Sequence, residues 1–134
     1  MILVDTSCWV DYLRGTGTTA AAEVGRLVRE DLVSVATCEP VAMELLAGSG
    51  QQSVHDKIET LVNGLSSLPF HPVTDFRTAA AIQRAVRSRG LVVRSLVDCM
   101  IAAIALRADV PVLHKDADYE AIAEVTRLQQ VSLR

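Results

Sequence analysis

The 134-residue sequence predicts one α/β domain, residues 1–134, built as a three-layer α/β/α sandwich around a central, mainly parallel sheet of about five strands. Three observations support this fold class. Short apolar runs alternate along the chain with longer segments of helical periodicity. The first run, Ile2-Leu3-Val4, is apolar at every position, as in strands buried on both faces of a parallel sheet. Half of the residues are hydrophobic, which is enough for a full core at this length.

The first half of the chain is expected to contain two strands and three helices. Gly15 ends the first helix, and Thr18 or Thr19 begins the second. Pro40 suits the first turn of the third helix, where its missing N–H is not needed. Trp9 is expected to be a core residue. In chain order these elements cover 2–4 (strand), 8–14 (helix), about 19–28 (helix), 32–36 (strand) and 39–47 (helix).

The second half is expected to contain four helices and three strands. Asn63-Gly64 marks the end of one helix, and Gly90 closes another. Pro69 and Pro72 remove backbone donors, so the strand that contains them is placed at the edge of the sheet. In chain order these elements cover 54–65 (helix), 68–73 (strand), 75–89 (helix), 95–106 (helix, apolar nearly all round and therefore buried), 111–114 (strand), a helix that runs to about 125, and 130–133 (strand).

The composition excludes some classes of protein. No apolar run approaches the roughly 18 residues of a membrane span, and the N-terminus lacks a signal-peptide pattern. The three cysteines have no metal-type spacing and are expected to be reduced thiols, which favours a cytoplasmic protein. The formal charge of −3 argues against a simple phosphate-binding surface, but setting five candidate site acids aside leaves +2 for the rest of the chain. Nucleic acid therefore stays open as a partner.

These five acids are candidates for a shared site. Asp5 follows the first strand and Asp116 closely follows the fourth, at the strand ends where parallel sheets place their ligand sites. Glu44 lies beside the apolar stripe of its helix, where a carboxylate is costly to bury without a partner. Asp98 is the one acid within the apolar helix, and Asp118 comes two residues after Asp116.

Several of these acids also have an ordinary structural explanation. Asp5 could cap the first helix. Asp98 comes three residues after Ser95 and could complete a capping box, although that box prefers Glu or Gln. Asp118 suits a cap of the last helix as well as it suits a ligand position.

The chemistry of the set points to a metal. Carboxylates held close together repel one another and raise their own pKa values, and a divalent cation removes this repulsion. An all-oxygen set without a converging His or Cys favours Mg²⁺ or Mn²⁺ over zinc. Such a site suits hydrolysis of phosphodiester bonds, because the ion activates a water and stabilises charge on the phosphate.

The acids lie in motifs that resemble those of PIN-domain nucleases. The motifs are ILVDTS around Asp5, AMELL around Glu44, SLVDCMIAA around Asp98, and HKDADY with Asp116 and Asp118. The resemblance spans essentially the whole chain. The short length and the HKDADY ending are similar to the VapC-type toxins of bacterial toxin–antitoxin pairs.

The resemblance implies a PIN-like fold and a toxin endoribonuclease, a hydrolase that needs Mg²⁺ or Mn²⁺ and cleaves structured RNA, usually tRNA or rRNA. It also implies a homodimer and a small cognate antitoxin of the VapB type, whose C-terminal segment covers the acidic cleft. The hydroxyl at Thr6 or Ser7 fits the family's pattern and implies a supporting hydrogen bond to an acid or to a metal-bound water.

We expect Asp5, Asp98 and Asp116 to bind the metal. Glu44 is expected to bind it as well, directly or through water, or to orient the attacking water. Asp118 is expected as a fifth ligand, with a cap of the last helix as its alternative role.

Basic residues are candidates for RNA contacts. A rim of arginines near an acidic site could bind phosphates. The alternative is an ordinary solvated face. The candidate residues are Arg84, Arg87, Arg89, Arg94 and Lys115.

Two other functions stay open at this point. One is a non-catalytic module that holds a partner in its acidic pocket. The other is phosphoryl transfer through an aspartyl-phosphate at Asp5. The haloacid-dehalogenase pattern places a second Asp two positions later, where this sequence has Ser7, and the paired acids of a receiver domain are absent.

Overall fold

The computed structural model describes all residues 1–134 and contains a five-stranded sheet. The strand order is β3-β2-β1-β4-β5, and every pair is parallel, with Leu3 opposite both Ala36 and Val112. The expected strand number is confirmed, and the sheet is fully rather than mainly parallel. The strands are β1 (Ile2–Val4), β2 (Val35–Thr37), β3 (Ser66–Ser67), β4 (Val112–His114) and β5 (Gln130–Ser132).

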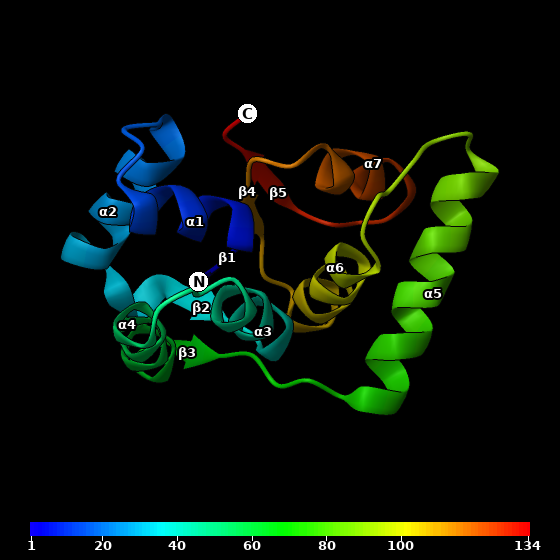
Figure 1. Cartoon of the computed structure of the whole chain (residues 1–134). Helices are drawn as coiled ribbons and strands as arrows, with labels where there is room; N and C mark the ends of the chain where they lie inside the picture. The colour runs from blue at the N-terminus through cyan, green and yellow to red at the C-terminus, as the bar shows by residue number, and fades with distance from the viewer.

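Seven α-helices cover the sheet and make the three-layer α/β/α arrangement that the alternating pattern predicts. The chain moves one way along the sheet from β1 to β3 and then crosses back to β4, so right-handed connections place the later helices on the other face. Figure 1 shows α1 and α2 on the opposite side of β1 and β4 from α5, α6 and α7. The helices are α1 (Thr6–Arg14), α2 (Thr19–Glu30), α3 (Glu39–Ala47), α4 (Gln52–Asn63), α5 (Pro72–Ser88), α6 (Leu96–Ala108) and α7 (Ala117–Val125).

The core lies between the sheet and the helices. Leu3 and Val4 of β1 and Trp9 of α1 are fully buried, as expected for a central strand and an aromatic core residue. The apolar helix α6 is buried along most of its length, including Ile101 and Ile104. Burial stabilises the fold by about 25 cal/mol for each Å² of apolar surface removed from water, so α6 contributes strongly to the core.

The prediction of a strand over 68–73 is wrong. A shorter strand, β3, precedes it at the predicted edge of the sheet, and α5 begins already at Pro72. Pro72 occupies the first turn of α5, where a proline fits without loss of a hydrogen bond. Phe70, in the connecting loop, packs edge-on against Phe76 with ring centroids 5.2 Å apart.

A second difference concerns the strand expected over 32–36. Residues Leu32–Ser34 form a 3₁₀ helix, η1, and only Val35–Thr37 form the strand β2. The apolar sequence is compatible with both conformations, because periodicity cannot distinguish them over so few residues. None of the helices is long and apolar enough to cross a membrane. All three cysteines are buried free thiols.

The topology brings two sequence-distant strand ends together. β1 and β4 are neighbours, and their connections lead away in opposite directions along the sheet. Ligand sites of open α/β sheets lie at such a reversal, beyond the C-terminal ends of the strands. Asp5 follows β1 directly, and Asp116 lies two residues beyond β4. The sheet therefore places these two predicted acids at its switch point.

Candidate active site

Asp5 combines both roles that the sequence left open. It is the N-cap of α1, because one carboxylate oxygen, Oδ2, accepts a hydrogen bond from the backbone N–H of Ser7 at 3.0 Å. The Ser7 hydroxyl donates to the same oxygen at 2.5 Å. The residue is only 3% exposed and lies at the end of the central strand. Capping thus fixes the side chain at the switch point of the sheet.

Glu44 reaches the same place from α3. Its carboxylate accepts a 2.7 Å hydrogen bond from the hydroxyl of Thr6, in the first turn of α1. Burial is the main cause that raises the pKa of Glu44, the charges of Asp5 and Asp116 raise it further, and the Thr6 donor lowers it. The expected supporting role of the hydroxyls is therefore seen twice, with Thr6 on Glu44 and Ser7 on Asp5.

Asp98 lies in the first turn of the buried helix α6 and is 5% exposed. Burial, reinforced by the neighbouring carboxyl groups, raises its pKa to about 9. The capping-box explanation is wrong, because the backbone N–H of Ser95 donates to Asp118 instead. Ser95 itself caps α6 through its hydroxyl, which accepts from the N–H of Val97. Asp98 is left as a buried carboxyl group directed at other acids.

Asp116 is held at the end of β4 by local contacts. It is the N-cap of α7 and accepts a 2.9 Å hydrogen bond from the backbone N–H of Asp118. Its own N–H donates to Nδ1 of His114 at 3.1 Å. His114 is fully buried and its Nε2 lies 2.6 Å from Oε1 of Gln130, so the proton belongs on Nε2. This histidine is a packed residue of the core.

Asp118 is not the helix cap that the sequence offered as an alternative, since Asp116 has that role. Its carboxylate accepts hydrogen bonds from the backbone N–H groups of Arg94 and Ser95, at 3.0–3.1 Å. These two residues form the turn that leads into α6. Asp118 therefore holds the start of the helix that carries Asp98.

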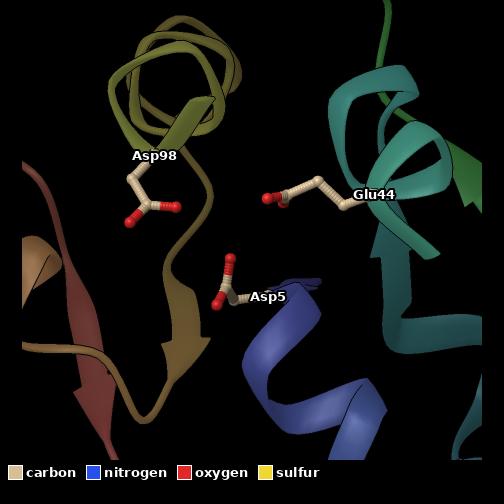
Figure 2. A group of neighbouring side chains, drawn as sticks. All are labelled: Asp5, Glu44 and Asp98. Carbon is tan, nitrogen blue, oxygen red and sulfur yellow. The ribbon is translucent and has the colours of Figure 1, made fainter. Parts of the chain in front are cut away.

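The carboxylates form two overlapping groups that share Asp98. One group contains Asp5 and Glu44, and the other contains Asp116 and Asp118, with ligand oxygens within 4.8 Å of one another in each group. Figure 2 shows Asp5, Glu44 and Asp98 directed at a common space from the start of α1, from α3 and from the start of α6. The donor set is all oxygen, and no cation of this chain is paired with it. These residues fit a hard divalent cation.

The predicted RNA contacts separate into two kinds. Arg84, Arg87 and Arg89 at the end of α5 and Arg94 in the following loop are exposed and form no ion pair. Lys115 differs, because its ammonium group lies 2.6 Å from the carboxylate of Asp11. Lys115 thus joins the end of β4 to α1, a role that its sequence position did not reveal.

Tyr119 is the residue of the site that sequence reasoning missed. Its hydroxyl donates to Oδ1 of Asp5 at 2.6 Å and lies 3.4 Å from Oδ1 of Asp98. Burial, reinforced by the carboxylates of Asp5 and Asp98, raises the pKa of this fully buried phenol well above its usual value. The available signal was its position directly after Asp118 in HKDADY.

Comparison with known proteins agrees with the family resemblance of the sequence motifs. The family model described as "PIN domain" matches residues 2–125. The chain is 51% identical over 134 residues to "Ribonuclease VapC11" of Mycobacterium tuberculosis and, equally, to "VapC ribonuclease Mb1587" of Mycobacterium bovis, covering 100% of each chain.

Solved structures share the fold at low sequence identity. VapBC2 from Rickettsia felis, bound to a promoter DNA fragment, matches with a TM-score of 0.76 and 15% identity over 100% of both chains. VapC20 of Mycobacterium tuberculosis, described as a sarcin–ricin loop cleaving toxin, matches with a TM-score of 0.66 and 17% identity, over 96% of this chain and 98% of that one.

Proposed function

Since the chain belongs to the PIN-domain family and is a VapC-type ribonuclease by its full-length relatives, we propose that it is a Mg²⁺- or Mn²⁺-dependent toxin endoribonuclease acting on structured RNA, tRNA or rRNA. The observation that carries this proposal is the convergence of two buried acids, Asp5 and Asp98, and the half-buried Glu44 on one point. An aspartyl-phosphate enzyme is not favoured, because Ser7 occupies the position where the haloacid-dehalogenase pattern places its second Asp.

We propose Asp5, Glu44, Asp98 and Asp116 as the catalytic, metal-binding residues, with Asp118 as a further ligand from the side of Asp116. A bound Mg²⁺ or Mn²⁺ would neutralise the carboxylates, activate a water and stabilise charge on the scissile phosphate. The chain supplies the orientation of these acids, because hydrogen bonds hold four of the five, namely Asp5, Glu44, Asp116 and Asp118. Glu44, which is partly exposed, is proposed to bind the metal directly or through water, or to orient the attacking water.

Phosphate groups of the RNA would meet the exposed arginines at one end of α5 and in the loop before α6. The side chains of Arg84, Arg87, Arg89 and Arg94 are free of acidic partners, so each can neutralise a phosphate. Lys115, held by Asp11, is proposed as a weaker contact whose ammonium group would be shared between Asp11 and a phosphate.

The antitoxin is proposed to occupy an apolar groove beside Glu44. This cavity of about 270 Å³ is lined by apolar side chains from α1, α3 and α4, among them Val10, Leu13, Val54 and Ile58. A segment lying there would reach the acidic cleft, where a basic side chain could pair with the carboxylates. Val54 is 42% exposed, so Val54→Glu should keep the fold and RNA cleavage but abolish neutralisation by the co-expressed antitoxin.

A homodimer and a cytoplasmic location are proposed from the family resemblance. Exposed apolar side chains on α5, Val73 at 71% and Phe76 at 52%, support an interface that a monomer would leave in water. Light scattering on the purified chain tests the dimer. A mass of one chain at micromolar concentration contradicts it.

The proposed activity is tested with purified, antitoxin-free protein and total RNA. Cleavage should require Mg²⁺ or Mn²⁺ and stop on addition of EDTA. Asp5→Ala and Asp98→Asn should remove cleavage while circular dichroism shows the same fold. Glu30→Gln, on the distant and exposed end of α2, is the matched control and should cleave normally. Cleavage that persists in the two site variants contradicts the assignment.

A further inference from the structure

The hydroxyl of Tyr119 lies between two carboxyl groups that belong to different elements. Its oxygen is 2.6 Å from Oδ1 of Asp5 and 3.4 Å from Oδ1 of Asp98. A phenol has one proton to donate. The shorter contact takes that proton, so Tyr119 is a hydrogen-bond donor to Asp5 and a close neighbour of Asp98.

This bond completes the set of donors around Asp5. Oδ2 already accepts two hydrogen bonds from Ser7, one from its N–H at 3.0 Å and one from its hydroxyl at 2.5 Å. A carboxylate oxygen has about two acceptor positions, so Oδ2 is filled. Oδ1 accepts only from Tyr119 and keeps one position free. The free acceptor position is therefore on Oδ1, the oxygen bonded to Tyr119. The hydroxyl of Tyr119 in turn neighbours Asp98.

The phenol itself is held in place. Tyr119 is fully buried, and its ring packs against the ring of His114 with centroids 4.9 Å apart. His114 is buried and hydrogen-bonded through both ring nitrogens, to Gln130 and to the N–H of Asp116. The donor to Asp5 therefore has one fixed position, set by packing that does not involve its hydroxyl.

We infer that Tyr119 is a positioning residue, which holds Asp5 so that one open acceptor position of Oδ1 faces a divalent cation. The inference rests on the proposed metal-dependent function. Hydrogen bonds to metal-binding carboxylates fix their orientation, and loss of such a bond typically weakens metal binding about 10- to 100-fold. A phenylalanine keeps the ring packing on His114 and removes only the donor.

The test compares Tyr119→Phe with Tyr12→Phe, which alters the only other tyrosine, a partly exposed residue of α1 that packs on Trp9. The dissociation constant for Mn²⁺ is measured by calorimetry and by electron paramagnetic resonance. Tyr119→Phe should bind Mn²⁺ at least about 10-fold more weakly, and its cleavage should recover at high Mn²⁺ concentration. Tyr12→Phe should match the wild type in both measurements.

A second measurement needs no variant at position 119. With ¹³C-labelled tyrosine, addition of Mg²⁺ to the wild type should shift the Cζ resonance of Tyr119 and leave that of Tyr12 unchanged. Equal Mn²⁺ affinity in Tyr119→Phe, or an unmoved Tyr119 resonance at saturating Mg²⁺, overturns the inference and leaves the nuclease assignment intact. A wild type that binds neither ion overturns both.

Discussion

The hydroxyl of Thr6 donates a 2.7 Å hydrogen bond to Oε1 of Glu44, which joins the first turn of α1 to the middle of α3. The two residues are 38 positions apart in the chain. The bond holds a partly buried carboxylate whose pKa is already raised by burial, and the Thr6 donor acts against that rise. Glu44 thus depends on Thr6 for both its direction and its charge.

Thr6→Val should therefore weaken catalysis more than it weakens the fold. Loss of the donor should lower the cleavage rate about 10-fold. It should also shift the acidic limb of the pH–rate profile to higher pH, because the pKa of Glu44 rises without the donor. The free energy of unfolding should fall by only about 0.5–1.5 kcal/mol. Thr6→Ser, which keeps the hydroxyl, is the control and should cleave nearly as the wild type does. Equal rates in the Val and Ser variants contradict this role.

The metal-free protein should lose stability as the pH rises from about 4 to about 9. The pKa of Asp98 is raised to about 9 in the folded chain, chiefly by burial, so the folded state keeps a proton that the unfolded state releases near pH 4. The unfolded state then binds fewer protons, and stability falls with pH. Thermal melting in EDTA between pH 5 and pH 9 measures this. A flat or rising melting temperature contradicts it.

Mg²⁺ should stabilise the chain more at pH 8 than at pH 6. Metal binding requires ionised ligands, and Asp98 gives up its proton more readily at the higher pH. The observable is the difference in melting temperature with and without Mg²⁺ at about 10 mM, a concentration well above the dissociation constant expected for such a site. A difference that is independent of pH shows that Asp98 is not among the ligands.

Asp98→Asn should remove cleavage and yet raise the melting temperature in EDTA. At pH 8 the folded chain keeps a proton on Asp98, whose pKa is raised to about 9 by burial and the neighbouring carboxyl groups, whereas the unfolded chain is stabilised by releasing it. The amide is similar in shape to the protonated carboxyl group and has no such proton to release, so the variant avoids this loss of stability. A gain of roughly 3 °C or more at pH 8 is expected for a domain of this size. A lower melting temperature than that of the wild type contradicts the raised pKa of Asp98.

The ion pair between Asp75 and Arg107 should carry stability without activity. Asp75 is 1% exposed and accepts two hydrogen bonds from the guanidinium, at 3.0 and 2.8 Å, so α5 is tied to the end of α6. Asp75→Ala should cost about 2–4 kcal/mol of unfolding free energy in urea titrations. The control is Glu23→Ala, which breaks an exposed pair with Arg26 and should cost less than about 1 kcal/mol.

This pair also has a defined pH dependence. The Arg107 guanidinium holds the pKa of Asp75 below its usual value. The stabilisation is therefore fully present above the unfolded pKa near 4 and is lost as the pH falls below it. In the Asp75→Ala variant, stability between pH 5 and pH 3 should fall less steeply than in the wild type. Identical slopes contradict the assignment.

Replacing Arg84, Arg87 and Arg89 together by Gln should weaken RNA binding and its dependence on salt. Each lost phosphate contact should reduce the slope of log affinity against log salt by roughly 0.7–0.9. Binding is best measured in the Asp98→Asn background, which holds RNA without cleaving it. Arg26→Gln, whose guanidinium is paired with Glu23, is the matched control. An unchanged slope in the triple variant shows that α5 is only a solvated face.

Much of this protein could be predicted from local pattern. The apolar run at Ile2–Val4, the buried helix α6 and the alternation of elements predict a parallel sheet, because side-chain burial follows the period of each element. The strand expected over 68–73 failed, because the same short stretch suits a loop that leads into a helix beginning at Pro72. A proline at position 72 is compatible both with an edge strand and with the first turn of a helix.

The acids themselves belong to the part that the sequence determined. The closeness of Asp5, Asp98 and Asp116 could be predicted because strand ends and helix starts of a parallel sheet meet at one edge, and Glu44 was placed there by its position beside the apolar stripe of its helix. Their surroundings could not be identified in this way. The hydroxyl of Tyr119 meets Asp5 across 114 positions, and Lys115 meets Asp11 across 104.

The tertiary structure alone decided which donors hold which acids. A hydrogen bond requires atoms within about 3 Å, and such a distance depends on the packing of two elements rather than on the periodicity of either. For this reason Asp118 proved to hold the turn before α6 and Tyr119 proved to hold Asp5. The residue types proposed to bind a metal can be read from the sequence, whereas their orientation follows from how the sheet and helices pack.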